Sequence, residues 1–230
     1  MPLPDVLEVV AATGVDGVEF AGLGETSPRT VARTLEEIGL EPAAAHVPID
    51  DLEEAPAAVA DTYHTLGCTR LVVPWLDPEA FESRQAFEET ATRLGTLGDV
   101  LASGEIEPFY HDHDQEFVPF ESEVEDGDEH EHAFDLLATE LESTPVAFEL
   151  DIGWATPAGG DPIRLLERYG DRIDLVHLKV VDGDSPCTLG TGDVPLARSS
   201  TPPALSRWTG LSTNTTTRPI QSWRSSTILG

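Results

Sequence analysis

The chain has 230 residues, 40% of them hydrophobic, which is enough to bury one sizeable core. Its 43 acidic residues against 13 Lys and Arg give a formal net charge of −30, so the surface repels phosphate backbones and anionic lipid. Neither a nucleic-acid partner nor a membrane is therefore expected. Cys68 and Cys187 are predicted to be free thiols of a cytoplasmic protein, because they form no CxxC pair and the sequence shows no leader or spanning segment.

Salt adaptation is a second consequence of the charge. Lys179 is the only lysine, and an acid-rich, lysine-poor surface suits a protein that stays in solution in concentrated salt. We therefore expect a halophilic, salt-adapted protein.

In chain order, short runs rich in Val, Ile and Phe alternate with longer amphipathic stretches, a pattern typical of repeated βα units. Strands are predicted at Gly17 to Ala21, Pro42 to Val47, Arg70 to Trp75, Glu107 to His111, Val146 to Ile152 and Ile173 to Lys179. Helices are predicted at Pro4 to Thr13, Pro28 to Ile38, Leu52 to Leu66, Pro78 to Ala102, Glu129 to Leu141 and Pro162 to Tyr169. The fold class is thus α/β, a (β/α)8 TIM barrel with its first and eighth strands missing or altered.

Composition changes abruptly near Ala197. All the acidic residues lie at or before Asp193, and 198–230 is rich in Ser, Thr, Arg and Pro. We interpret 1–197 as the barrel domain and 198–230 as a non-native-looking tail, for which two hypotheses stand: a flexible tail, or a segment translated in a shifted reading frame. Read one base back, the codons for 212–221 permit Tyr-Glu-Tyr-Asp, which restores an acidic composition. A closed barrel would then need one strand ahead of Met1 and one after Ala197.

Polar side chains collect at the carboxyl ends of the predicted strands, where barrel enzymes place their functional groups. These are Glu19, His46, the run from His111 to Glu116, the pair Glu149 and Asp151, and His177. Imidazole and carboxylate from successive strands suit Mn, Fe, Co, Zn or Mg ions. His111, Asp151 and His177 are the predicted metal ligands, and Asp151 is favoured over Glu149 because it lies nearer its strand end.

Four motifs together resemble one known family. They are GVDGVEF at 14–20, FYHDHD at 109–114, ELDIGW at 149–154 and VHLK at 176–179, and they look like the sugar phosphate isomerase/epimerase group of the xylose isomerase-like TIM barrels. The resemblance covers roughly Leu3 to Leu196. It implies a divalent ion held by an acid or His on the fifth strand, Asp on the sixth, His on the seventh and Glu on the eighth.

This chain departs from the family pattern at two places. Many relatives carry Glu where His111 stands, and there two glutamates exchange a proton on a carbon next to a carbonyl. Val180 stands where Asp is common after His-Leu-Lys. The Tyr-Glu-Tyr-Asp of the alternative frame resembles the family's eighth-strand motif and would supply the missing Glu.

The resulting hypothesis is a metal-dependent sugar or sugar phosphate isomerase/epimerase that abstracts a proton next to a carbonyl. Glu116 and His113 are the candidates for proton transfer, and Glu19, His46, Trp154 and Lys179 for substrate contact. The partner is a small sugar, polyol or sugar phosphate, and a homo-oligomer is compatible with the sequence. Three alternatives stand beside it: an inosose dehydratase-like polyol dehydratase, an inactive truncated remnant, and an apurinic endonuclease-like enzyme, which the acidic charge disfavours.

Overall fold

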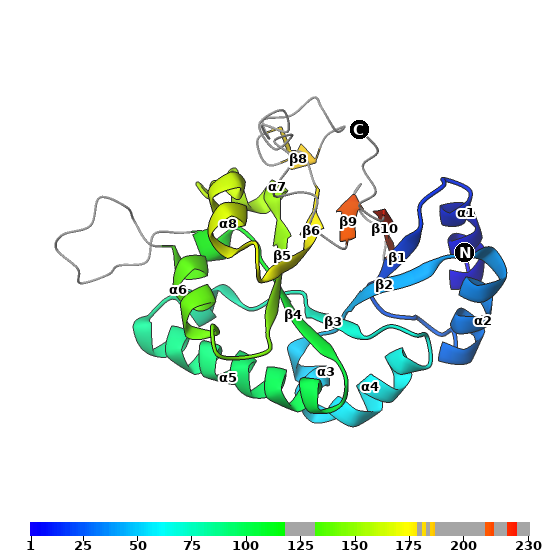
Figure 1. Cartoon of the computed structure of the whole chain (residues 1–230), viewed down its shortest axis with the longest axis horizontal. Coiled ribbons are helices and arrows are strands. Elements are labelled where there is room, and N and C mark those ends of the chain that lie inside the picture. The colour runs from blue at the N-terminus through cyan, green and yellow to red at the C-terminus, as the bar shows by residue number, and fades with distance from the viewer. Residues whose placement is uncertain (118–131, 179–180, 183–184, 187–209, 214–219, 225–230) are drawn as a thin grey trace.

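The computed structural model describes residues 1–117, 132–178, 181–182, 185–186, 210–213 and 220–224, with side chains up to Leu178. All six predicted strands are present (Figure 1). They are β1 (Gly17–Phe20), β2 (Glu41–His46), β3 (Arg70–Val73), β4 (Glu107–His111), β5 (Ala147–Asp151) and β6 (Ile173–His177). Each lies side by side with the next in parallel, so they form one curved sheet.

Two further strands close this sheet into a barrel. β9 (Gly210–Thr213) pairs in parallel with β6, and β10 (Ile220–Arg224) pairs antiparallel with both β9 and β1. A regular TIM barrel has eight parallel strands. Here β1 to β6 occupy six of the eight strand positions in the regular way, and β9 and β10 occupy the other two with altered pairing. This confirms the predicted fold class, a TIM barrel with two strands missing or altered. β9 and β10 lie within 198–230, and the domain boundary at 197 and the shifted frame remain predictions.

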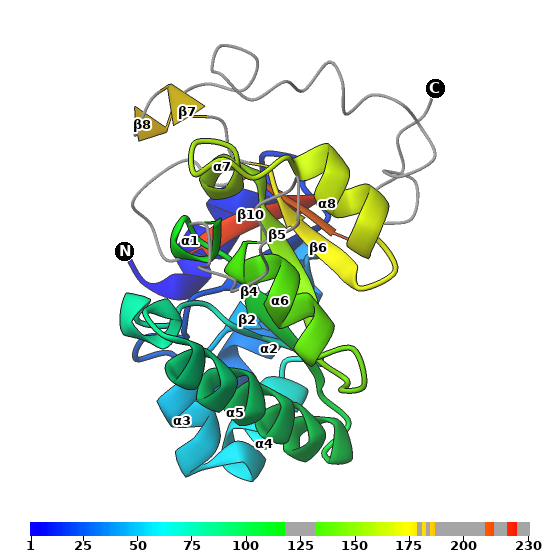
Figure 2. The same cartoon turned by 90° about the vertical axis from the view of Figure 1, so that its left-hand side faces the viewer.

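A small antiparallel pair lies outside the barrel: β7 (Val181–Asp182) and β8 (Ser185–Pro186). The helices cover the outside of the strands, as two perpendicular views show (Figures 1 and 2). They are α1 (Leu3–Ala11), α2 (Pro28–Ile38), α3 (Ile49–Glu54), α4 (Pro56–His64), η1 (Pro78–Phe81), α5 (Arg84–Ser103), η2 (Gln115–Phe117), α6 (Ala133–Glu140), α7 (Ile152–Ala155) and α8 (Pro162–Tyr169). None of the described helices is both long and apolar enough to cross a bilayer.

Local sequence explains the helix ends. The hydroxyl of Ser27 accepts a hydrogen bond from the Thr30 N–H at 3.3 Å, so it caps α2 at its start. Gly39 ends α2 in the left-handed conformation, with φ of 72°, which glycine adopts without steric cost. Asp161 caps α8 in the same way as Ser27 caps α2.

Two predicted helices are each divided, which corrects the sequence analysis. The expected helix Leu52 to Leu66 is α3 and α4, because Pro56 has no N–H to donate and drives Ala55 out of the helical region, to φ −145°. The expected helix Pro78 to Ala102 is η1 and α5. Ser83 is extended between them, and its hydroxyl accepts from the Ala86 N–H to start α5.

A small apolar layer fills the barrel below the polar strand ends. Ala44, Val72, Phe109 and Leu175 form this cluster, apart from the larger core between sheet and helices. Three of them precede a histidine by two residues on their strand. Since side chains two apart share a face, His46, His111 and His177 project into the next layer of the barrel interior.

Candidate metal and substrate site

Six ionisable side chains form a buried layer above this apolar cluster. Three are imidazoles, and three are the carboxylates of β1 and β5. All six sit at or near the carboxyl ends of their strands, where parallel strands bring them together. They are Glu19, His46, His111, Glu149, Asp151 and His177, and all but His46 are at least 95% buried.

Glu149 is the centre of the inner half of this layer. Its Oε2 lies 2.8 Å from Nε2 of His46 and 2.9 Å from Nδ1 of His111. Its Oε1 lies 3.0 Å from Nε2 of His177. Glu19 adds a second carboxylate, 2.7 Å from Nε2 of His177 and 3.3 Å from Nε2 of His46. Two carboxylates therefore bind three imidazoles on one side of the rings.

These contacts set the charges of the layer. Burial lowers the pKa of His46, but Glu19 and Glu149 outweigh it and raise that pKa to about 9. The same two carboxylates raise the pKa of His177 well above its ordinary value against the effect of burial. Burial opposes ionisation of Glu149, yet the charges of His177 and His46 hold its pKa well below the usual range. Burial and the neighbouring His177 lower the pKa of His111, although its bond to Glu149 acts the other way.

Asp151 approaches the opposite side of the rings. Its Oδ2 is 3.9 Å from Nε2 of His111 and 3.8 Å from Nδ1 of His177. That nitrogen of His177 is buried and has no hydrogen-bond partner among the described residues. Two ligands each about 2.0–2.2 Å from one ion lie at most about 4.4 Å apart, so Asp151 is close enough to each of the two imidazole nitrogens to share a divalent ion with it.

The layer contains one group whose ligand atoms all lie within 4.8 Å of one another: His46, His111, Glu149 and His177. A second set of donors is Asp151 with His111 and His177, in which Asp151 Oδ2 approaches the imidazole nitrogens that do not contact Glu149. We call Asp151, His111 and His177 the triangle. A His and carboxylate donor set suits divalent transition-metal ions.

The structure brings together the three predicted ligands, His111, Asp151 and His177, and places the predicted contact residues Glu19 and His46 in the same layer. Trp154 lies in α7 beside them, and the other oxygen of Asp151 accepts from its N–H at 3.1 Å. Lys179 lies outside the described residues.

The two predicted proton-transfer residues have different surroundings. His113 is half-buried, and its ring centroid is 4.9 Å from that of His111. Glu116 is fully buried; its carboxylate accepts from the hydroxyl of Tyr110 and from the His113 N–H at 2.8 Å. Burial raises the pKa of Glu116 to about 6 despite those bonds. Both of its oxygens therefore hold the β4 loop in shape.

Sequence analysis did not find the bridging role of Glu149. The signal was available, since Glu149 and Asp151 share a strand face. It included Asp112 among the polar strand-end residues but assigned it no role; its Oδ1 accepts from the Asp151 N–H at 3.0 Å. Burial, with Asp151 and Glu116 nearby, raises the pKa of Asp112 well above its ordinary value.

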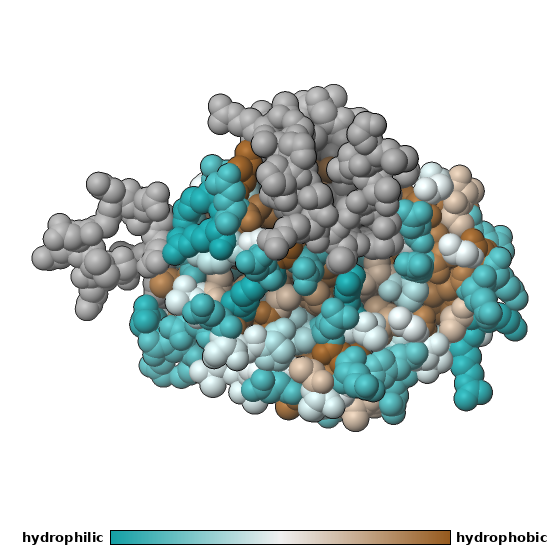
Figure 3. Space-filling view, viewed as in Figure 1, coloured by the Kyte–Doolittle hydropathy of each residue, from teal (hydrophilic) through white to brown (hydrophobic). Residues whose placement is uncertain are grey.

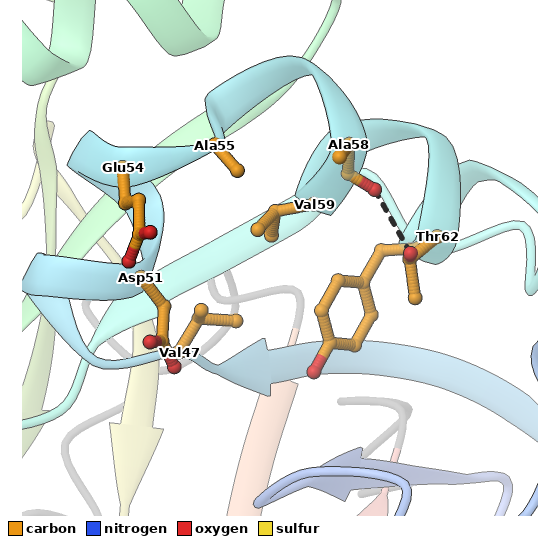
Figure 4. A pocket seen from close by; sticks show the side chains of 8 residues that line it. Val47, Asp51, Glu54, Ala55, Ala58, Val59 and Thr62 are labelled. Carbon is orange, nitrogen blue, oxygen red and sulfur yellow. Dashed lines mark hydrogen bonds between the residues drawn. The ribbon is translucent and has the colours of Figure 1, made fainter.

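A pocket of about 380 Å³ lies elsewhere, between α3 and α4 (Figure 4). Its lining includes Val47, Asp51, Val59 and Tyr63. Val47 follows His46 directly, and because successive strand residues point to opposite faces, this pocket faces away from the histidine layer. It does not form part of the site.

Comparison with solved structures agrees with the fold. A protein described as a sugar phosphate isomerase/epimerase from Parabacteroides distasonis superposes with a TM-score of 0.68 at 20% identity, over 82% of this chain and 77% of that one. A probable 3-DHS dehydratase of Bacillus anthracis gives 0.67 at 14% identity, over 86% and 82%. The chain thus has the fold of the xylose isomerase-like TIM barrels, which confirms the fold that the resemblance of its motifs implied.

Among proteins of assigned function, the chain is similar to the inosose dehydratase of Lacticaseibacillus casei. The two are 26% identical in an alignment 195 positions long, which covers 76% of this chain and 62% of that relative. No family model matches the chain.

Proposed function

We propose that the chain is a divalent-metal-dependent enzyme that removes a proton next to the carbonyl of a cyclic polyol ketone and so eliminates water. The observation that carries the proposal is the triangle of Asp151, His111 and His177, with its buried and unpartnered imidazole nitrogen. The dehydration is favoured over isomerisation by the similarity to an inosose dehydratase.

Of the two groupings, we assign the ion to the triangle. The inner nitrogens of His111 and His177 already lie 2.7–3.0 Å from Glu149 and Glu19, which is hydrogen-bond distance. Metal-binding imidazoles commonly donate their second N–H to a carboxylate, which fixes the tautomer and aims the free nitrogen at the ion. Glu149 and Glu19 are therefore positioning residues, and Asp151, His111 and His177 the ligands.

A bound ion would polarise the carbonyl oxygen of the substrate and stabilise the negative charge that develops there. The proton needs an acceptor near this point, and His113 suits the role because it is half-buried beside His111. Glu116 supports it by accepting from the backbone of His113. Lys179, Trp154 and His46 remain the proposed substrate contacts.

The side chains of the site favour a neutral substrate. Its described residues include five buried carboxylates, Glu19, Asp112, Glu116, Glu149 and Asp151, and no Lys or Arg. Arg and Lys are the side chains that proteins commonly use to bind phosphate, so the described part of the site offers a phosphate group no such partner. We therefore place a neutral polyol ahead of a sugar phosphate. A DNA backbone is disfavoured more strongly, because the whole chain carries a charge of −30.

Isomerisation or epimerisation is the second candidate, because it uses the same ion and the same first proton abstraction. Its support is the structural similarity to a sugar phosphate isomerase/epimerase. The two reactions differ in their products, since dehydration alone lowers the mass of the substrate by one water.

The test has two steps. Isothermal titration with Mn²⁺ should show one tight site in the full chain that Asp151→Ala abolishes, while Asp114→Ala, an exposed carboxylate of the β4 loop, leaves it unchanged. Circular dichroism checks that both variants fold. The metal-loaded chain is then incubated with an inosose and followed by mass spectrometry.

Each outcome separates the candidates. Loss of water supports the dehydratase, and an isomer of unchanged mass supports the isomerase/epimerase. Metal binding without turnover of inososes or sugars supports the inactive remnant. Unchanged Mn²⁺ binding in Asp151→Ala would overturn the proposed site.

A further inference from the structure

Three aromatic rings stand at the ends of three successive strands beside the histidine layer. Trp75 follows β3, His113 follows β4 and Trp154 follows β5. The ring centroids of Trp75 and His113 are 5.0 Å apart, and those of His113 and Trp154 are 5.7 Å apart. His113 also contacts the proposed ligand His111. We call Trp75, His113 and Trp154 the aromatic wall.

Hydrogen bonds hold each loop of this wall. The side-chain amide of Gln115, in the loop of His113, donates to the carbonyl of Leu76, the neighbour of Trp75. Gln115 is 91% buried, so this brace is shielded from water. On the other side, Asp151 accepts from the N–H of Trp154. The wall is thus fixed relative to the proposed metal ligands. Little conformational entropy is therefore lost when a substrate contacts it.

Trp75 presents open aromatic surface at this wall. Its side chain is 44% exposed, and it is one of four large hydrophobic residues exposed in the described chain. The rings of Trp75 and His113 meet at 85°, an edge-to-face contact. In such a contact the imidazole covers at most one face of the indole, so the other face can receive a ligand.

The wall and the layer have complementary chemistry. An indole face is electronegative and attracts weakly polarised C–H groups, besides offering apolar contact area. The neighbouring layer supplies carboxylate oxygens and imidazole nitrogens, which can hydrogen-bond to hydroxyl groups. A six-membered ring that carries hydroxyls matches both, since its C–H groups form a flat apolar face and its oxygens lie around the rim.

We propose that the aromatic wall is a binding subsite for the C–H face of a six-membered polyol ring, with Trp75 as its main contact and as the residue that selects cyclic over open-chain polyols. The inference deepens the proposed function and rests on its metal site only for the orientation of the ring oxygens. An open-chain polyol has no such face and stacks poorly on the indole.

The test compares one cyclic and one open-chain probe. Calorimetry in saturating Mn²⁺ measures the Kd of myo-inositol and of sorbitol for the wild type, Trp75→Ala, Trp75→Phe and Val100→Ala. Val100 is equally exposed on α5 and serves as the control. Trp75→Ala should weaken myo-inositol binding about 10-fold, Trp75→Phe should recover part of it, and sorbitol binding and Mn²⁺ affinity should not change.

Two results would overturn the subsite: equal myo-inositol affinity in wild type and Trp75→Ala, or an equal loss for both probes. Absence of myo-inositol binding to the metal-loaded wild type would overturn it as well, while leaving the metal site standing. The series is repeated in EDTA. If Mn²⁺ does not bind at all, the proposed function fails, and a 10-fold effect of Trp75→Ala on myo-inositol alone still supports the subsite.

Discussion

Glu149 shows how much one side chain can decide in this site. It is 1% exposed and lies within 3.0 Å of nitrogens from three histidines on three other strands. A carboxylate in this place can accept from all three rings, whereas a neutral amide can accept through one oxygen only. The orientation of the proposed ligands therefore depends on a residue that does not bind the ion.

Glu149→Gln should weaken Mn²⁺ binding about 10-fold to 100-fold, the usual effect of removing an outer carboxylate. Titration calorimetry measures it, with Glu36→Gln on the exposed side of α2 as the charge-matched control. Complete loss of binding would instead indicate that Glu149 is itself a ligand.

Glu116 should make stability depend on pH. Its pKa in the folded state is about 6, above the 4.5 of an ordinary Glu. The native state thus favours the protonated form, and this contribution to stability is fully present below pH 4.5 and lost as pH rises through 6. Glu116→Gln does not titrate, so its stability relative to wild type should rise by about 2 kcal/mol over that interval.

Urea denaturation of both proteins at a series of pH values between about 4 and 7 checks this. A stability difference that stays constant with pH would contradict the raised pKa. Glu116 accepts hydrogen bonds from Tyr110 and from the His113 N–H, and these bonds hold the β4 loop in shape. They offset part of the free-energy cost of burying this acid.

At the scale of elements, one carboxylate joins two helices beside the site. Asp135 on α6 is fully buried, and its Oδ1 accepts from Arg164 at 2.9 Å, Arg168 at 3.3 Å and the Tyr169 hydroxyl at 2.7 Å, all on α8. These two helices lie on either side of β5 and α7 in the chain, so the network fixes the surroundings of Asp151.

Asp135→Ala should therefore lower the free energy of unfolding by about 2 kcal/mol, less than for a fully buried pair because both arginines are partly exposed. Asp135→Asn, which keeps one acceptor oxygen, should lose less. Thermal denaturation measures both against Glu167→Ala, an exposed position on α8. A loss no larger than that of the control would mean that the network adds nothing.

For the whole molecule, closure of the barrel depends on β9 and β10, which pair with the free edges of β6 and β1. A chain that ends at residue 209 lacks both strands and exposes those edges. It should lose a sharp thermal transition and form larger species in size-exclusion chromatography. A chain that ends at residue 224 keeps both strands and should behave like the full chain. Equal behaviour of the two would contradict this closure.

Charge acts over the whole surface as well. Hydrophilic residues are spread over the described surface in Figure 3, and the net charge of −30 opposes the compact state. The melting temperature should rise with KCl, because salt screens the repulsion between surface carboxylates. Most of the rise should occur below about 1 M, since the Debye length falls from about 10 Å at about 0.1 M to about 3 Å at about 1 M. Differential scanning calorimetry measures it, and a flat or falling curve would contradict salt adaptation.

The sequence by itself determined the six parallel strands, the helix caps at Ser27 and Asp161, and the positions of the predicted ligands at strand ends. Each depends on local information: alternation places His111, Asp151 and His177 on inward faces at strand ends. Even the division of the long helices was visible in principle at Pro56 and Ser83.

Only the tertiary structure decided which atoms meet. His46 contacts Glu149 across 103 residues, and His177 contacts Glu19 across 158. It likewise showed that Glu116 supports its own loop. Strand periodicity sets the face on which a side chain lies, but the partner of each nitrogen depends on the register between strands and on closure of the barrel, which distant segments determine together.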